Sequence, residues 1–267
     1  MNTHQILGPI VCVTIVTLFV AFFVNYNNVS AEMNVPKTAG KGFAVLELFT
    51  SEGCSSCPPA DELMATIEKE AKGKAIYVLA YHVDYWNRLG WKDIFSDADY
   101  SKRQIQYGSW LNQPQIYTPQ VIINGTAEFV GSDEPAIRKA ISEQLAAKSL
   151  VTLILKGYKN NEVLNVQYQA GKGVTRRALL IAIVQKAAQS KVERGENAGH
   201  TLSHVQIVRK LHAEPISVAG SGTAKIELPK EFNNQNWEIL GLVQDESSGE
   251  ILGVATADLK DSANAPK

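Results

Sequence analysis

Two cysteines separated by two residues are the side chains best suited to chemistry in this sequence. Cys54 and Cys57 stand in the stretch SEGCSSCPPADEL, and the third cysteine, Cys12, lies in an apolar run near the N-terminus. A thiolate at Cys54 could attack a disulfide, after which Cys57 could resolve the mixed disulfide. Ser55 and Ser56 add hydroxyl donors and no charge. The pair therefore predicts thiol–disulfide exchange.

Other interpretations of the pair stay open from the residues alone. It could be an inert reduced pair, a structural disulfide or half of a metal site. Zinc is disfavoured because two thiolates need two further ligands, and the folded part has no other cysteine. A soft metal such as copper(I) could be handled through the two thiolates. We predict no resident metal and no other cofactor.

The residues after the pair affect how its first thiol is activated. Free N–H groups and the positive dipole end of a helix N-terminus stabilise a nearby thiolate. Pro58 and Pro59 disfavour helical geometry in the residues before them. We therefore expect the regular helix to begin only near Pro59, which would weaken the stabilisation of a Cys54 thiolate.

The stretch HVDYWNRLGW carries a second set of candidate side chains. His82 and Asp84 are two residues apart at the end of a predicted strand and so share a face, and Trp86 follows in a polar loop. His82 could carry protons near neutral pH, and Trp86 could line a substrate groove. The alternative is that His82 is a buried, hydrogen-bonded histidine and that the aromatic side chains belong to the core.

A third stretch, RGENAGHTLSHVQIVR, is charged and loop-like. His200 and His204 invite a metal interpretation, but four residues on a strand span roughly 13 Å, which is too far for one ion. A better hypothesis is that this loop docks toward the first part of the chain, with Arg194 or Glu196 near the dithiol.

Hydrophobic patterning predicts the elements that position these side chains. FAVLELF (43–49) and KAIYVLAYHVD (74–84) are short apolar runs typical of buried strands, and the segment between them has helical spacing. This order indicates a parallel βαβ unit. A helix over 99–111, a hairpin turning at Asn124–Gly125 and a helix capped by Asp133 or Ser132 are expected to follow.

From residue 150 onward the pattern changes. About seven short strand-like runs are separated by Gly, Asn, Asp and Ser, which is typical of an antiparallel sandwich. We therefore predict a domain over 43–148, a β-rich, sandwich-like domain over 149–260 and a tail over 261–267. The expected fold class is an α/β domain followed by a mostly antiparallel β-sandwich-like domain.

The first predicted domain resembles the thioredoxin superfamily. The Cys-x-x-Cys pair follows the first strand and opens the first helix, YTPQVIING places a Thr-Pro pair just before the hairpin, and a capped helix ends the segment. More closely, VLELFTSEGCSSCPPAD, HVDYW, YTPQVIING and RGENAGHTLSHVQIVR are similar to a family of thioredoxin-like envelope proteins catalogued as domain of unknown function 1223. That resemblance runs nearly the full length and implies no established substrate.

The superfamily resemblance implies roles for three more residues. Pro119 would be the cis-proline that packs against the dithiol, and the backbone of Thr118 would pair with an extended substrate segment. Glu47 interrupts an apolar strand. It would be the buried proton acceptor beneath the resolving cysteine, or it could face a solvated groove.

The N-terminus predicts export. Residues 6–24 form an uncharged apolar run, so 1–24 could be a membrane anchor or a cleaved signal peptide, followed by a linker over 25–42. The expected location is the cell envelope or periplasm, membrane-anchored or secreted. The formal net charge of −1 gives no reason to expect nucleic acid as a partner.

The function favoured at this point is a thiol–disulfide oxidoreductase, in which Cys54 attacks, Cys57 resolves and protein thiols or disulfides are the partners. The alternatives are a non-catalytic binding or copper(I)-handling protein, and an interaction protein whose β-rich domain does the work. The sequence fixes neither the direction of electron flow nor the oligomeric state.

Overall fold

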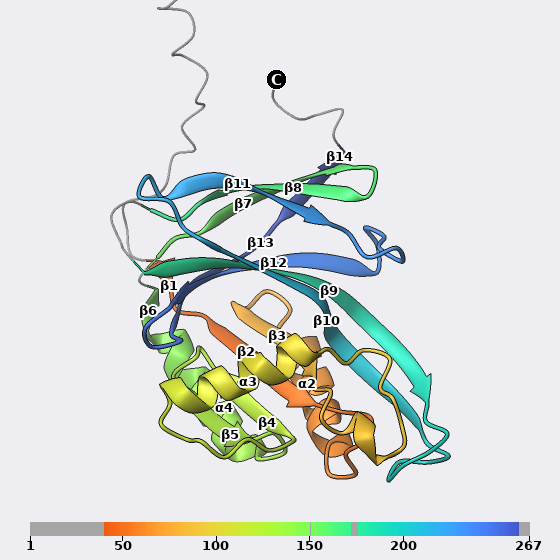
Figure 1. Cartoon of the computed structure of the whole chain (residues 1–267). Helices are drawn as coiled ribbons and strands as arrows, with labels where there is room; N and C mark the ends of the chain where they lie inside the picture. The colour runs from red at the N-terminus through yellow and green to blue at the C-terminus, as the bar shows by residue number, and fades with distance from the viewer. Residues whose placement is uncertain (1–39, 150, 172–175, 262–267) are drawn as a thin grey trace, which may run out of the picture. The chain divides into compact units, whose positions relative to one another are not determined.

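The computed structural model describes residues 40–149, 151–171 and 176–261 (Figure 1). These residues fall within one compact unit, Val35–Lys267. The predicted signal or anchor over 1–24, nearly all of the linker and the last residues of the tail lie outside the described residues. Within the described ranges, no helix is long and apolar enough to cross a membrane.

The first half of the chain folds in the predicted order of elements. A short strand β1 (Gly40–Lys41) precedes it, and the 3-10 helix η1 (Asn87–Leu89) lies in the loop after the second buried strand. The main elements are β2 (Ala44–Thr50), α2 (Pro58–Glu70), β3 (Ile76–His82), α3 (Ala98–Trp110), β4 (Gln120–Ile123), β5 (Ala127–Val130) and α4 (Glu134–Ala146). Asp133 caps α4 by accepting a hydrogen bond from the N–H of Ala136.

The second half consists of strands, as predicted. After the short β6 (Lys148–Ser149) these are β7 (Ile154–Asn160), β8 (Val163–Gln169), β9 (Arg177–Lys191), β10 (Thr201–Pro215), β11 (Ser221–Glu227), β12 (Trp237–Asp245), β13 (Ile251–Thr256) and β14 (Asp258–Asp261). Two of them, β9 and β10, are each fifteen residues long and form one antiparallel hairpin.

The predicted fold class, a thioredoxin-like α/β domain followed by a β-sandwich-like domain, is wrong. The described chain is mostly strand, and strands from both halves join one eight-stranded sheet in the order β13-β12-β9-β10-β3-β2-β4-β5. The remaining strands form a four-stranded sheet, β11-β8-β7-β14, and the pair β1-β6. The two halves of the chain are therefore continuous through the sheet, at the parallel pairing of β10 with β3 (Ile207 with Ala80).

Burial on both faces of β9 explains this difference. Leu180, Ala182 and Val184 pack into the core shared with α3, β2 and β3. Leu179, Ile181 and Ile183 point to the other face and pack against the four-stranded sheet. A strand covered on both faces has an uninterrupted apolar sequence. The run ALLIAIV is therefore as compatible with the centre of a large sheet as with a separate sandwich.

The helices cover the other half of the large sheet. On β2, Leu46 and Leu48 face α2 and α4, whereas Val45 and Phe49 face α3. Figure 1 shows the three helices around the β2–β5 part and the long β9–β10 hairpin extending beside them. This arrangement brings the tip of that hairpin to the loop that contains the cysteines.

Candidate functional site

The two cysteines form a disulfide between the end of β2 and the start of α2. Their Cα atoms are 5.4 Å apart, and both residues have an exposed fraction of 0%. Cys57 occupies the N-cap position, and α2 begins at Pro58, next to Pro59, so the helix starts beyond Cys54 as predicted. Proline fits the first turn of a helix because the N–H groups there have no partner within the helix. Cys54 lies three residues before the cap, so Cys57 is the cysteine at the helix end.

The Thr-Pro loop lies directly against the cysteine loop. The Thr118–Pro119 peptide bond is cis. The Ser56 hydroxyl is 3.5 Å from the Thr118 carbonyl, to which it donates, and it lies 3.4 Å from the Cys54 sulfur. Trp86 donates its indole N–H to the Thr118 hydroxyl at 2.8 Å. The structure thus brings together the predicted residues of the dithiol, the Thr-Pro loop and the aromatic loop.

Glu47 does not lie beneath Cys57, and it does not face a solvated groove. It is fully buried on the α3 side of β2, where both carboxylate oxygens accept hydrogen bonds from Arg103, at 2.6 and 2.9 Å. The Tyr107 hydroxyl donates a third bond at 2.5 Å. Side chains alternate along a strand, so only residue 46 or 48 could face α2 from this position. Both expectations for Glu47 are corrected: it is one half of a buried ion pair.

A different buried carboxylate lies on the cysteine side. Asp61 follows Cys57 by four residues on α2, so the two share one face of the helix. Burial raises the pKa of Asp61 to about 7, although the nearby His204 and a hydrogen bond from Thr50 act in the opposite direction. A carboxyl with this pKa can both accept and release a proton near neutral pH.

Asp61 belongs to a cluster of buried titratable groups. His82 Nδ1 is 2.7 Å from Asp93, and the ring centroids of His82 and His204 are 4.7 Å apart. Burial alone would raise the pKa of Asp93, but the His82 imidazole and backbone N–H donors hold it below its usual value. Glu52, fully buried, accepts the indole N–H of Trp91 at 2.6 Å. We call Glu52, Asp61, His82, Asp93 and His204 the buried cluster.

The tip of the β9–β10 hairpin holds the cysteine loop from outside. The Glu196 carboxylate accepts hydrogen bonds from the Ser55 N–H and hydroxyl at 3.0 and 2.6 Å. These bonds hold the pKa of Glu196 below its usual value. Asn197, which is buried, donates to the carbonyls of Glu52 and Cys54 at 2.9 and 3.0 Å. The prediction that this loop docks near the dithiol through Glu196 is confirmed; Arg194 is exposed on the same tip.

One predicted residue, Asp84, lies outside the site around the cysteines, and one functional candidate, Asp61, had not been predicted. Asp84 accepts a hydrogen bond from Ser101 on α3 at 2.5 Å and so belongs to the packing of that helix. His82 is buried and paired with Asp93, as in the second interpretation given for it. The sequence reasoning missed Asp61, although its spacing of four from Cys57 was a usable signal. Within the described ranges, no group of three or more His, Cys, Asp or Glu residues is arranged to hold a metal ion.

Fold and site together define a class of protein: a mostly β chain whose eight-stranded mixed sheet carries a buried Cys-x-x-Cys disulfide beside a cis-proline loop and buried titratable groups. The chain belongs to the family described as Protein of unknown function (DUF1223), whose model matches residues 45–244.

Two of the solved structures that are similar to this chain cover most of its length. Protein AGR_C_4864 from Agrobacterium tumefaciens is 26% identical, with a TM-score of 0.63 over 87% of this chain and 99% of that chain. HBP35 of Porphyromonas gingivalis is 18% identical, with a TM-score of 0.58 over 86% of this chain and 80% of that chain, and this likeness concerns the fold alone. A comparison with curated protein sequences gives no match.

Proposed function

We propose that this protein is a thiol–disulfide oxidoreductase that acts on protein thiols or disulfides. The observation that carries the proposal is the disulfide between Cys54 and Cys57, with Thr118–Pro119 on one side and the carboxyl of Asp61 four residues further along α2. A structural disulfide would need neither a neighbouring carboxyl that titrates near pH 7 nor a Thr-Pro loop in contact with its serines.

The proposed reaction starts from the reduced dithiol. The Cys54 thiolate attacks one sulfur of a substrate disulfide, and the electron pair of the broken bond leaves on the other substrate sulfur. The Cys57 thiol then gives its proton to the Asp61 carboxylate, and the Cys57 thiolate attacks Cys54. The Cys54–substrate bond breaks, the second substrate sulfur leaves as a thiolate, and the enzyme disulfide forms. The substrate gains two electrons, and the reverse sequence oxidises a substrate dithiol.

A trapping experiment tests the proposal. In a Cys12→Ser background, the full chain with Cys57→Ser should accumulate mixed disulfides with partner proteins, because the step that releases them is lost. The matched variant Cys54→Ser should accumulate none, because it lacks the attacking thiol. Both variants are compared on non-reducing gels after thiols are blocked with an alkylating agent. Identical patterns would show that Cys54 is not the attacking residue and would refute the proposal.

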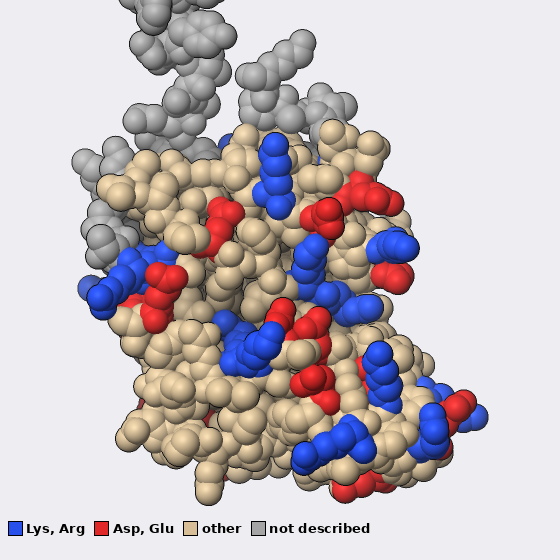
Figure 2. Space-filling model, viewed as in Figure 1, with Lys and Arg blue, Asp and Glu red and all other residues tan. Residues whose placement is uncertain are grey.

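We also propose that the protein works in the cell envelope. The uncharged apolar run over 6–24 supports export, either as an anchor or as a cleaved signal. Protein disulfides persist in oxidising compartments outside the cytosol. On the face that Figure 2 shows, lysine and arginine side chains alternate with aspartate and glutamate, and no large patch of one sign is visible.

The relation to the thioredoxin superfamily is proposed only for the surroundings of the dithiol. The strand, the Cys-x-x-Cys loop, the helix and the Thr-Pro loop stand in the order typical of that superfamily. The fold of the whole chain is different, because β10 pairs with β3 and carries the sheet into the second half.

A further inference from the structure

Strand β10 brings an unusual histidine to the inner side of the cysteine loop. The side chain of His204 is 1% exposed, and neither of its ring nitrogens has a hydrogen-bond partner within the described part of the chain. Its Nε2 lies 3.5 Å from Glu52 Oε1, and its Nδ1 lies 3.7 Å from Asp61 Oδ2. A buried imidazole therefore stands between two buried carboxylates, just beyond hydrogen-bond distance from each.

The protons available to this arrangement can be counted. A neutral imidazole carries one N–H and can donate to only one carboxylate, whereas an imidazolium can donate to both. Two buried carboxylates with no cation between them would be strongly disfavoured, so at least one of the three groups must carry an additional proton. That proton can lie on His204 or on Asp61, and the two positions differ by a short transfer across the 3.7 Å gap.

The other titratable groups facing His204 do not supply this proton. His82 directs its Nδ1 to Asp93 at 2.7 Å, so these two groups form a pair of their own. Trp91 donates to the second oxygen of Glu52 and leaves Oε1 for His204. His204 is thus the member of the buried cluster that faces both Glu52 and Asp61.

We propose that His204 is a positioning residue of the redox site, which holds Asp61 and shares with it the proton that Cys57 gains or loses during thiol–disulfide exchange. This inference rests on the proposed function. It gives the second half of the chain a part in the reaction, since His204 belongs to β10 and reaches Asp61 only because β10 joins the sheet beside β3.

The electrostatic consequence has a definite sign. When the shared proton lies on His204, its positive charge lowers the pKa of Asp61 against the effect of burial. A neutral side chain at this position should therefore move the titration of Asp61 to higher pH. An opposite charge at this distance changes a carboxyl pKa by one to three units, so we expect a shift of at least about one pH unit.

The test uses the full chain and dithiothreitol as the only reactant. The rate of reduction of the Cys54–Cys57 disulfide is measured from pH 5 to 9 for the wild type and for His204→Gln. Dithiothreitol has the same thiolate fraction for both proteins at each pH, so its ionisation cancels when the rate of the variant is divided by the rate of the wild type. His212→Gln is the matched control, because His212 lies on the same strand, half-buried, and is paired with Glu214. We expect the rate of the wild type to show an inflection near neutral pH. In His204→Gln the inflection should lie about one pH unit higher, and in His212→Gln it should not move.

A second measurement covers the case in which His204→Gln does not fold. The ring resonances of His204 and His212 are followed by NMR in the oxidised and reduced wild type from pH 5 to 9. The proposal requires that reduction shifts the titration of His204 and leaves that of His212 unchanged. An unshifted inflection in a folded His204→Gln protein, or a His204 titration that is the same in both redox states, would overturn it. Neither measurement involves a partner protein, so a failure here is distinct from an empty trap in the Cys57→Ser experiment.

Discussion

Removing the side chain of Asn197 should open the path to the disulfide. Both cysteines have an exposed fraction of 0%, and Asn197 donates one hydrogen bond to the Cys54 carbonyl and one to the Glu52 carbonyl. A neutral hydrogen bond contributes about 1 kcal/mol to stability, so Asn197→Ala weakens the closed position of the tip by about 2 kcal/mol. Since 1.4 kcal/mol corresponds to a factor of ten, the open population should rise about 30-fold.

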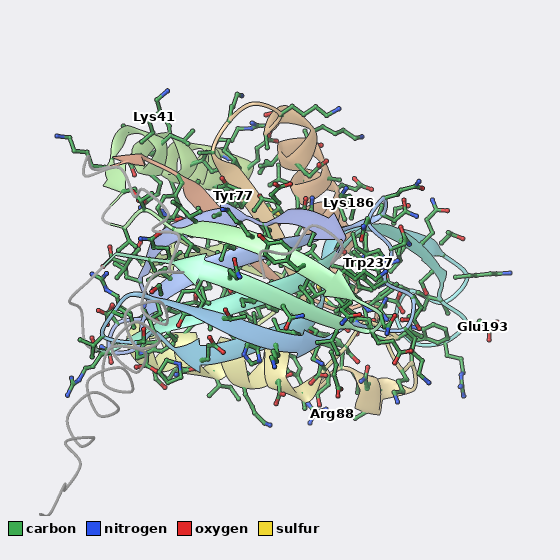
Figure 3. All side chains as sticks on the ribbon, turned by 90° about the horizontal axis from the view of Figure 1, so that it is seen from above. Lys41, Tyr77, Arg88, Lys186, Glu193 and Trp237 are labelled. Atoms are coloured by element: carbon green, nitrogen blue, oxygen red, sulfur yellow. A yellow bond between two sulfur atoms is a disulfide. The ribbon has the colours of Figure 1, made fainter. Side chains whose placement is uncertain are left out.

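The assay is the rate at which a small thiol reduces the disulfide under native conditions. When opening and closing are faster than the chemical step, the rate follows the open population, so it should rise about 30-fold in the variant. Glu193→Gln serves as the control on the same tip, because Glu193 is exposed and Figure 3 shows it at the outer end of the hairpin.

A second control separates local opening from a general loss of stability. Asn124 is also a buried asparagine, with three hydrogen bonds to Val45, Phe43 and Gln144, far along the chain from the cysteines. Asn124→Gly, which suits its positive φ of 47°, should lower the unfolding midpoint and leave the reduction rate unchanged. If Asn197→Ala reduces at the wild-type rate, or if Asn124→Gly accelerates reduction equally, the tip does not control access and the reasoning is refuted.

Three further predictions concern stability and the surroundings of the site. Glu47→Gln should lower the free energy of unfolding by about 3–5 kcal/mol, because Arg103 stays buried without its counter-charge. Denaturant unfolding measures this loss. The pH profile of disulfide reduction should not change. Gly131→Ala should destabilise the chain by about 1–3 kcal/mol and alter the exchange rate, because its new Cβ would lie 2.9 Å from the Cβ atoms of Ala60 and Pro119; a wild-type melting temperature would contradict this packing. Burial raises the pKa of Asp61 from 3.8 to about 7 in the folded chain, so its protonated form favours folding, and this stabilisation is full below about pH 4 and is lost as the pH rises toward 7. The free energy of unfolding of the wild type relative to Asp61→Asn should therefore fall between pH 4 and pH 7, and a constant difference would exclude the raised pKa.

The local elements could be predicted from the sequence because their signals are local. The apolar run before Cys54, the Asn124–Gly125 turn and the Asp133 cap each depend on residues within a few positions of one another. The pairing of β10 with β3 joins segments more than a hundred residues apart, and no short pattern encodes it.

Of the candidate site, the dithiol, the Thr-Pro loop and the docking of Glu196 could be inferred, whereas the buried cluster could not. Asp61 lies in the first turn of a helix, where an acidic residue is common because it interacts favourably with the helix dipole. The sequence therefore gives no reason to expect a buried carboxyl there. Glu52 and Asn197 lie in stretches rich in turn-forming residues, where exposure is the ordinary expectation. Their burial follows from the hairpin tip lying over the cysteine loop, which is a tertiary contact.

The continuity of the large sheet also has a consequence for the order in which the site is completed. A chain that emerges from its N-terminus presents Cys54 and Cys57 long before the residues that cover and support them, Asn197 and His204, have appeared. Contacts of this sequence separation form slowly because a long loop must close first. During that interval the two thiols are open to other thiols and oxidants in the compartment where the chain folds. The pair therefore meets its surroundings first as an unprotected dithiol of a partly folded chain, and it is screened from them only when the last third of the protein closes over it.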